Sequence, residues 1–173
     1  MRRAPLLPLA CALILSAGQN IFAQAAGGAS SGDKKIAVGL GMEYNMNSRD
    51  YFAGGLDFGF DYNLPVSFAK FALGAVFTAS YNFDGICVLE PGGMFRWYFL
   101  GHDHTGWFAQ GDVGAYIILG DENGEKNLLV MGGLRGGYRL PLEAGNISMY
   151  VEPYGRIGYP FAFGVGAIAG IRF

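Results

Sequence analysis

Residues from Ile36 onward alternate between two chemically different faces with a period of two. In the first segment, large apolar side chains occupy the even positions from Ile36 to Met46, and small or polar side chains lie between them. A period of two is that of a β-strand, in which successive side chains point to opposite sides. The alternation therefore restricts the chain to β-structure in which each strand has one large apolar face and one minor face, rich in Gly and Ala.

The same pattern occurs about eight times along the chain. The segments are residues 36–46, 52–63, 71–83, 88–99, 107–119, 128–140, 147–157 and 161–173. Turn residues separate them, including those at 141–146 and 158–160. Consecutive strands with short connections form an antiparallel meander, and closure of the meander removes its exposed edges. We therefore expect an all-β, eight-stranded antiparallel up-and-down barrel over residues 34–173.

The composition of the minor face indicates which side of the barrel is outside. The chain contains 29 Gly among 173 residues and only 15% charged residues, whereas an average protein has about 7% Gly and about 25% charge. Such a face is too poor in charge to be a water-facing exterior. Inside a narrow barrel, glycine leaves room for large side chains from neighbouring strands. We therefore expect an apolar exterior in contact with lipid and an interior filled by side chains.

Eleven charged residues fall on the minor face. They are Glu43, Asp57, Asp61, Glu90, Arg96, Asp112, Arg135, Arg139, Glu152, Arg156 and Arg172. Six are acidic and five are basic, so the face is close to neutral. Because isolated charges away from water are very unfavourable, we expect these groups to pair in an interior ion network. The alternative is a catalytic or ion-conducting site, although the charges are spread over nearly all strands.

The N-terminal residues have the features of an export signal. Two arginines precede an apolar stretch at residues 10–17, and Ala23 and Ala25 fit the small-x-small cleavage rule. We predict that residues 1–25 are a cleavable signal peptide and that residues 26–33 form a flexible N-terminal segment. A retained membrane anchor is an alternative, but prolines and polar residues interrupt the stretch before it reaches the roughly 20 residues that a spanning helix needs.

Lipidation at Cys11 is a second alternative. It is disfavoured because the apolar stretch continues beyond the cysteine, whereas a lipidation site should end it. Removal of the signal would leave Cys87 alone, so no intrachain disulfide is expected. We expect Cys87 to act as a small buried or lipid-facing hydrophobe. Nucleic acid is not an expected partner, because 12 Lys and Arg against 14 Asp and Glu give no basic field.

Aromatic residues recur near the ends of the predicted strands. They are Tyr44, Phe52, Tyr62, Phe71, Tyr81, Phe83, Trp97, Phe99, Trp107, Tyr138, Tyr159 and Phe173. Two aromatic belts at the membrane interfaces are typical of a transmembrane barrel. The final segment is an alternating apolar strand that ends in a C-terminal phenylalanine.

The signal, the eight alternating strands and the closing sequence FAFGVGAIAGIRF resemble the small eight-stranded bacterial outer-membrane proteins, a class that includes OmpX, OmpW and the membrane domain of OmpA. The resemblance implies an outer-membrane location with both termini in the periplasm. It also implies that Phe173, with Ile171 and Ala169, is the signal presented to the barrel-assembly machinery. The resemblance further implies that the folded barrel is a monomer whose partner is outer-membrane lipid, and that it meets the assembly machinery only during biogenesis.

Enzymatic activity is not expected. Some eight-stranded outer-membrane barrels are lipid A acyltransferases or deacylases, and such chemistry needs a serine beside a histidine and a carboxylate. The only histidines are His102 and His104, with Asp103 between them, in a turn on the periplasmic side. No serine stands beside them, and two imidazoles with one carboxylate make a weak metal site. We predict a solvated polar turn, with no metal and no cofactor.

Pro91 and Pro153 interrupt two predicted strands. A proline removes a ladder hydrogen bond and usually marks a bulge, so a structural bulge is the prediction at both positions. A lateral exit for a small apolar solute is the alternative. The sequence thus predicts an integral outer-membrane barrel with a structural or passive role. A narrow channel for small solutes is one alternative function. A surface protein interacting through loops is another, which the short connections disfavour, since the longest external one spans only residues 121–127.

Overall fold

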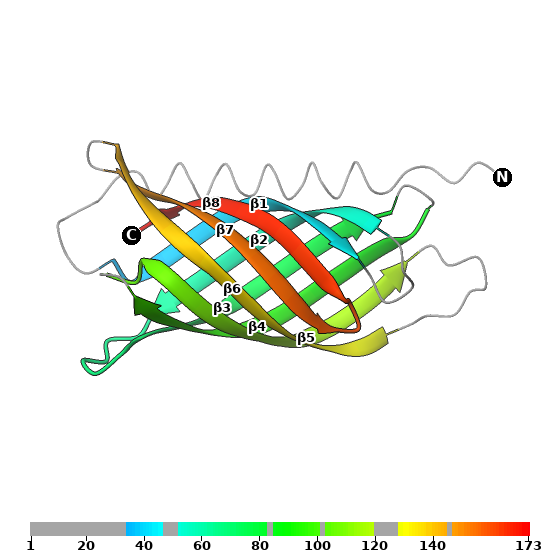
Figure 1. The fold of residues 1–173 in the computed structure, drawn as a ribbon, viewed down its shortest axis with the longest axis horizontal. Coiled ribbons are helices and arrows are strands. Elements are labelled where there is room, and N and C mark those ends of the chain that lie inside the picture. The colour runs from blue at the N-terminus through cyan, green and yellow to red at the C-terminus, as the bar shows by residue number, and fades with distance from the viewer. Residues whose placement is uncertain (1–33, 47–51, 83–84, 101–102, 120–127, 145–146) are drawn as a thin grey trace. The chain divides into compact units, whose positions relative to one another are not determined.

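The computed structural model describes residues 34–46, 52–82, 85–100, 103–119, 128–144 and 147–173. Over these residues the chain forms β1 (Ile36–Met46), β2 (Phe52–Asn63), β3 (Lys70–Tyr81), β4 (Cys87–Leu100), β5 (Gly106–Leu119), β6 (Leu128–Ala144), β7 (Ile147–Tyr159) and β8 (Phe163–Arg172). The strands form a closed antiparallel barrel in sequence order (Figure 1). The predicted eight-stranded barrel is therefore confirmed. Some predictions concern residues outside the described ranges. These are the signal peptide with Ala23 and Ala25, the segment 26–33, Phe83, His102 and the loop 121–127.

The first and last strands close the barrel. β1 and β8 pair over ten residue positions, from Ala37 opposite Arg172 to Met46 opposite Phe163. Beyond this ladder, the Ile36 and Phe173 backbones exchange N–H to O hydrogen bonds of 3.1 and 2.8 Å. The start of β1 and the end of β8 therefore lie at one end of the barrel, which we call the termini end. Over the described residues, the structure contains no helix with the length and apolarity needed to cross a membrane.

β6 is longer than the alternation predicts. Residues 141–146 are predicted as a turn, but β6 continues to Ala144. Pro141 pairs with Tyr150, and Glu143 pairs with Ser148. The hairpin between β6 and β7 therefore extends four residues past the predicted strand end, and the turn prediction for 141–144 is wrong.

The opposite end of the same hairpin also differs from the prediction. β7 continues to Tyr159, and Gly158 pairs with Gly133 where a turn is predicted. β8 begins at Phe163 instead of Phe161. Phe161 is buried at 2% exposure and packs against Tyr116 and other residues of the barrel interior. A side chain expected to open the last strand therefore fills one end of the barrel.

Neither interrupting proline produces the predicted bulge. Leu89 pairs with Ile117 and Gly92 pairs with Gly114, so the register between β4 and β5 is the same on both sides of Pro91. Pro153 likewise keeps its place opposite Ala167 on β8. The register shift between β4 and β5 lies near the termini end, between Tyr98 and Leu100. Each proline ring faces outward, and the ladder continues past it without an inserted residue.

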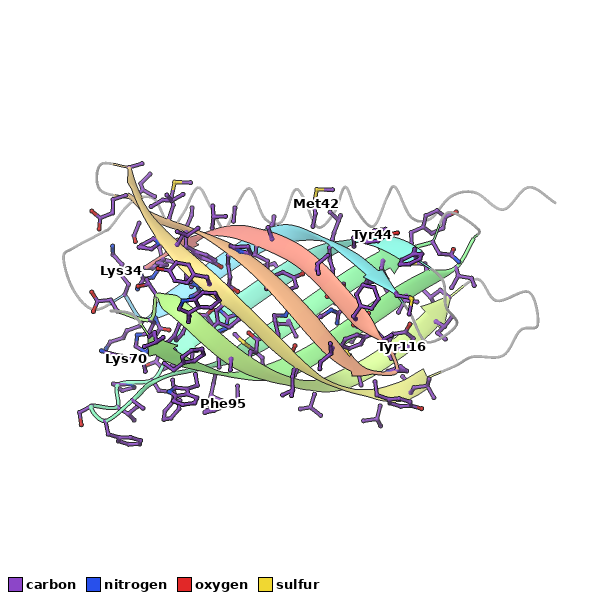
Figure 2. All side chains as sticks on the ribbon, in the orientation of Figure 1. Lys34, Met42, Tyr44, Lys70, Phe95 and Tyr116 are labelled. Carbon is purple, nitrogen blue, oxygen red and sulfur yellow. The ribbon has the colours of Figure 1, made fainter. Side chains whose placement is uncertain are left out.

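Large apolar side chains lie outside, and glycines make room inside. Met42, Val113, Val130, Leu134 and Ile157 are each more than 60% exposed. On the inner face, a methyl group added at Gly166 would lie 2.6 Å from the Tyr154 hydroxyl oxygen, and one added at Gly170 would lie 2.6 Å from the Tyr150 ring. Real Cβ atoms do not approach other atoms so closely, and these glycines are therefore required by the large side chains opposite them. Figure 2 shows Met42 and Phe95 pointing away from the barrel.

Exposed aromatic side chains occupy both ends of the exterior. Tyr62, Trp97, Phe99 and Trp107 are exposed toward the termini end, and Tyr44, Phe52 and Tyr159 are exposed toward the other end. Several of them pack against neighbouring rings. The Tyr44 and Phe52 ring centroids are 5.3 Å apart, as are those of Trp107 and Tyr138.

Not every glycine lies inside. Gly136 and Gly155 pair across β6 and β7 on the outer surface, where they help to line a shallow apolar hollow of about 440 Å³ together with Leu134. A methyl group added at Gly136 would have no heavy atom nearer than the Phe108 carbonyl oxygen, at 3.9 Å. Inward and outward glycines therefore provide a matched pair for testing the orientation of the faces.

We predict that Gly166→Ala lowers the free energy of unfolding by about 1–3 kcal/mol, the usual cost of overpacking. Gly136→Ala should change it by less than about 0.5 kcal/mol, because the added methyl group enters open space. Urea unfolding of the protein folded in lipid vesicles, followed by tryptophan fluorescence, measures both values. Equal losses in the two variants would contradict the assignment of the glycine-rich face to the crowded interior.

Candidate functional site

The structure places all eleven predicted charged residues on the inner face of the barrel. Each is no more than 7% exposed. They come from every strand except β3, because the minor face of each strand points inward. Several ion pairs connect strands that are far apart in the sequence, and the pairs divide into groups along the barrel.

The group nearer the termini end joins two guanidinium groups to two carboxylates. Arg96 donates from both terminal nitrogens to the two oxygens of Glu152, each at 2.9 Å. Arg139 donates from Nε to Glu152 at 2.7 Å and from Nη2 to Asp61 at 2.7 Å. Arg96 also lies 3.4 Å from Asp61. The formal charges of these four side chains cancel, which offsets part of their desolvation cost.

Aromatic rings pack on the faces of these guanidinium groups. The Arg139 guanidinium carbon lies 4.2 Å from the centre of the Tyr150 ring, and that of Arg96 lies 4.2 Å from the Phe108 ring. The Arg96 Nη1 group also donates to the Tyr98 hydroxyl at 3.0 Å. Carboxylates thus bind each guanidinium group at its edge, in the plane of the group, and an aromatic ring packs on its face.

The group toward the opposite end is built around Arg156. Arg156 donates to Glu43 at 2.6 and 2.7 Å and to Glu90 at 2.6 Å. The Tyr154 hydroxyl donates to Glu43 at 2.9 Å, and the Asn45 amide donates to it at 2.8 Å. One guanidinium group here binds two carboxylates, and neutral donors supply the other hydrogen bonds to Glu43.

Three further interior charges, Asp57, Asp112 and Arg135, lie between these two groups, and Arg172 lies at the termini end. Gln110 accepts from the Arg96 Nε at 2.7 Å and donates to Asp112 at 2.5 Å. The Arg135 Nε lies 3.7 Å from the Asp112 carboxylate. Asp57 accepts from the Thr78 hydroxyl at 2.5 Å, while its second oxygen is buried without a hydrogen-bond partner. Gln110 therefore links the termini-end group to the central pair.

Several polar residues of the interior are missing from the predicted set. They are Asn45, Thr78, Tyr98, Gln110, Tyr150 and Tyr154. Thr78 lies on the minor face of β3, and each of the others shares the alternation phase of the charges on its own strand. Their positions in the sequence therefore carry the relevant signal. They are absent from the predicted set because that set contains only charged residues, and these side chains carry no formal charge.

The predicted assembly residues lie where β8 closes on β1. Ile171 pairs with Val38 and Ala169 pairs with Leu40. The Phe173 backbone continues this pairing to Ile36. The last strand is therefore an integral part of the closed barrel.

His104 lies in a turn, as predicted, but its ring is only partly exposed to solvent. Its ring packs edge-on against Tyr98, with centroids 5.7 Å apart and an interplanar angle of 87°. Burial lowers the pKa of His104 below its usual value, and the nearby charges of Lys70 and Arg172 lower it further. The ring is thus predominantly neutral near neutral pH. Among the described residues, no group of three or more His, Cys, Asp or Glu side chains is arranged to hold a metal ion.

The barrel is similar to Neisserial surface protein A. The match to this solved structure has a TM-score of 0.59 and covers 82% of this chain and 98% of that chain. Sequence identity is 9%, so the likeness concerns the fold. No protein-family model and no curated protein matches the chain. The small-barrel fold that the sequence predicts is thus shared with Neisserial surface protein A.

We predict that Glu152→Gln lowers the free energy of unfolding by about 3–5 kcal/mol, the usual effect of removing one partner from a buried ion pair. The amide keeps the shape of the side chain but leaves Arg96 and Arg139 without the carboxylate that both bind. Urea unfolding in lipid vesicles gives the value.

Glu143→Gln is the control, because it makes the same chemical change at an exposed position of β6 and should shift stability by less than about 0.5 kcal/mol. If Glu152→Gln were as mild as this control, the interior network would not stabilise the barrel.

Proposed function

We propose that the protein is an integral outer-membrane barrel with a structural or passive role and a closed interior. The observation that carries this proposal is the inversion of the barrel. Its charges are inside and paired, while its large apolar side chains are outside. A soluble barrel has the reverse arrangement, because its exterior must be hydrated.

The exterior supports a lipid environment. Side chains such as Val130 at 74% exposure and Met42 at 71% lie on strands that also present Leu56, Leu73 and Ile157. In water, so large a continuous apolar surface would drive association. In a bilayer it is solvated by acyl chains, and the closed ladder satisfies the backbone polar groups that lipid cannot.

The likeness to Neisserial surface protein A supports the same assignment. That protein is described as a surface protein, and its barrel is almost wholly covered by the match. Within the proposal, residues 1–25 are removed during export and both termini face the periplasm. Phe173, with Ile171 and Ala169, is recognised by the barrel-assembly machinery. The folded barrel is a monomer in contact with outer-membrane lipid, without enzymatic activity or a cofactor.

The filled interior favours a passive role over the narrow-channel alternative. Arg96, Arg139 and Glu152 connect opposite parts of the barrel wall across its interior, and Arg156 does so nearer the other end. A solute would have to break several charge-assisted hydrogen bonds to pass. The unbroken register at Pro91 and Pro153 likewise gives no support to a lateral exit. The surface-interaction alternative depends on connections such as 121–127, which lie outside the described residues.

We predict that vesicles containing the folded protein do not swell in isosmotic arabinose, because the paired side chains block passage. Flotation of the protein with the vesicles shows that it is inserted, and a general porin serves as the positive control. Rapid swelling at a rate proportional to the inserted protein would contradict the closed interior and favour the channel.

A further inference from the structure

Three basic side chains from separate elements converge on the mouth of the barrel at the termini end. Lys70 is the first residue of β3, and its partner on β4 is Tyr98. His104 precedes β5 and packs on the same tyrosine. Arg172 is the last residue of β8. Figure 2 shows Lys70 at the same end of the barrel as Lys34, which precedes β1.

Two of these side chains have buried nitrogen atoms without hydrogen-bond partners. Arg172 is 6% exposed. One of its terminal nitrogens donates to the Asp103 backbone carbonyl, but its Nε has no partner. The His104 Nε2 is likewise buried and unpaired. An unpaired buried polar atom is costly, and an acceptor brought to the Arg172 Nε and to a protonated His104 Nε2 would remove that cost.

The turn before β5 holds His104 in this position. Asp103 and His104 both have left-handed backbone conformations, with φ of 50° and 54°. Such conformations are unfavourable for residues other than glycine, although Asp and His adopt them more readily than most. They direct the imidazole toward Tyr98 at the barrel mouth, and the hydrogen bond of His104 to the Phe71 backbone adds to its position.

The neighbouring carboxylates offset the positive charge of this mouth only in part. Asp61 accepts hydrogen bonds from Arg139 and Arg96, deeper in the barrel. Asp103 is exposed, and the contact it makes to Arg172 comes from its backbone carbonyl. Lys70 and Arg172 both lower the pKa of His104, against a smaller opposing effect of Asp61. The three basic groups therefore repel one another at a place where an anion would attract all three.

We propose that Lys70, His104 and Arg172 form a binding site for a phosphate-type oxyanion at the termini-end mouth. The tetrahedral anion offers several acceptor oxygens, which match the Lys70 ammonium, the Arg172 Nε and the protonated His104 Nε2. The same chemistry is presented by free inorganic phosphate and by the headgroup of an anionic phospholipid. This site is distinct from the paired interior network below it.

Binding at this site is linked to protonation. His104 is held neutral by burial and by its two positive neighbours, and a bound anion opposes both effects. Because the linkage is reciprocal, a ligand that favours the charged ring raises its pKa and is itself bound more tightly as pH falls. Phosphate binding should therefore strengthen as the pH is lowered through the titration of His104.

The test is NMR of histidine-labelled protein folded in phosphate-free maltoside micelles, with His104→Gln used to assign the His104 signal. Added millimolar phosphate should raise the titration midpoint of His104 by about one pH unit, which corresponds to about tenfold tighter binding to the protonated ring. Chloride at matched ionic strength should leave the midpoint nearly unchanged. A parallel titration with phosphatidylglycerol in the micelles separates a free-phosphate site from a headgroup site.

Lys70→Gln should weaken the binding of phosphate or headgroup about tenfold through the loss of one charged hydrogen bond. Lys35→Gln is the matched control, since Lys35 is exposed at the same end but is not among the charges acting on His104. A mobility shift on boiling shows that each variant is folded. The proposal is overturned if neither phosphate nor phosphatidylglycerol moves the His104 midpoint, or if the two lysine variants bind equally.

Discussion

Closure of β8 onto β1 is the constraint on which the other features of the molecule depend. The ladder from Ala37 and Arg172 to Met46 and Phe163 leaves no free edge between the first and last strands, which is the condition for a sheet to be stable where water cannot hydrogen-bond its backbone. Closure also turns the two faces of the alternating strands into an inside and an outside. The small, charged face then has to fill a narrow interior, and the large apolar face has to meet the surroundings.

The interior satisfies two opposing demands, for space and for charge compensation. Glycines such as Gly166 and Gly170 lie against tyrosine rings that a Cβ atom would displace. The rings in turn pack on guanidinium groups, as Tyr150 does on Arg139, and carboxylates hold those groups in place. Glu152 is completely buried, and its two oxygens bind both Arg96 and Arg139. The glycines, rings and ion pairs thus form one packed unit, and the same packing fills the path that a solute would take.

The sequence predicts the fold well, because a period of two survives in every strand and determines which residues face inward. It predicts the extent of β6 poorly, since Pro141 marks a turn locally but pairs with Tyr150 in an extended hairpin. Partners within the interior are also not predictable from one chain. Arg156 binds Glu43, 113 residues earlier, and that contact depends on strand stagger around the closed barrel. The position of His104 depends on a left-handed turn that nothing in the local alternation indicates.

We propose that the large apolar face of these strands contacts lipid. Fluorescence quenching with lipids brominated along their acyl chains tests this contact, in a Trp97→Phe, Trp107→Phe background with one new tryptophan. Val113→Trp places the probe on the outer face of β5, where Val113 is 64% exposed, and Tyr116→Trp places it inside, where Tyr116 is 1% exposed. We predict strong quenching of the first probe by brominated lipid and weak quenching of the second. Quenching of the Val113→Trp probe by aqueous iodide but not by brominated lipid would contradict the account.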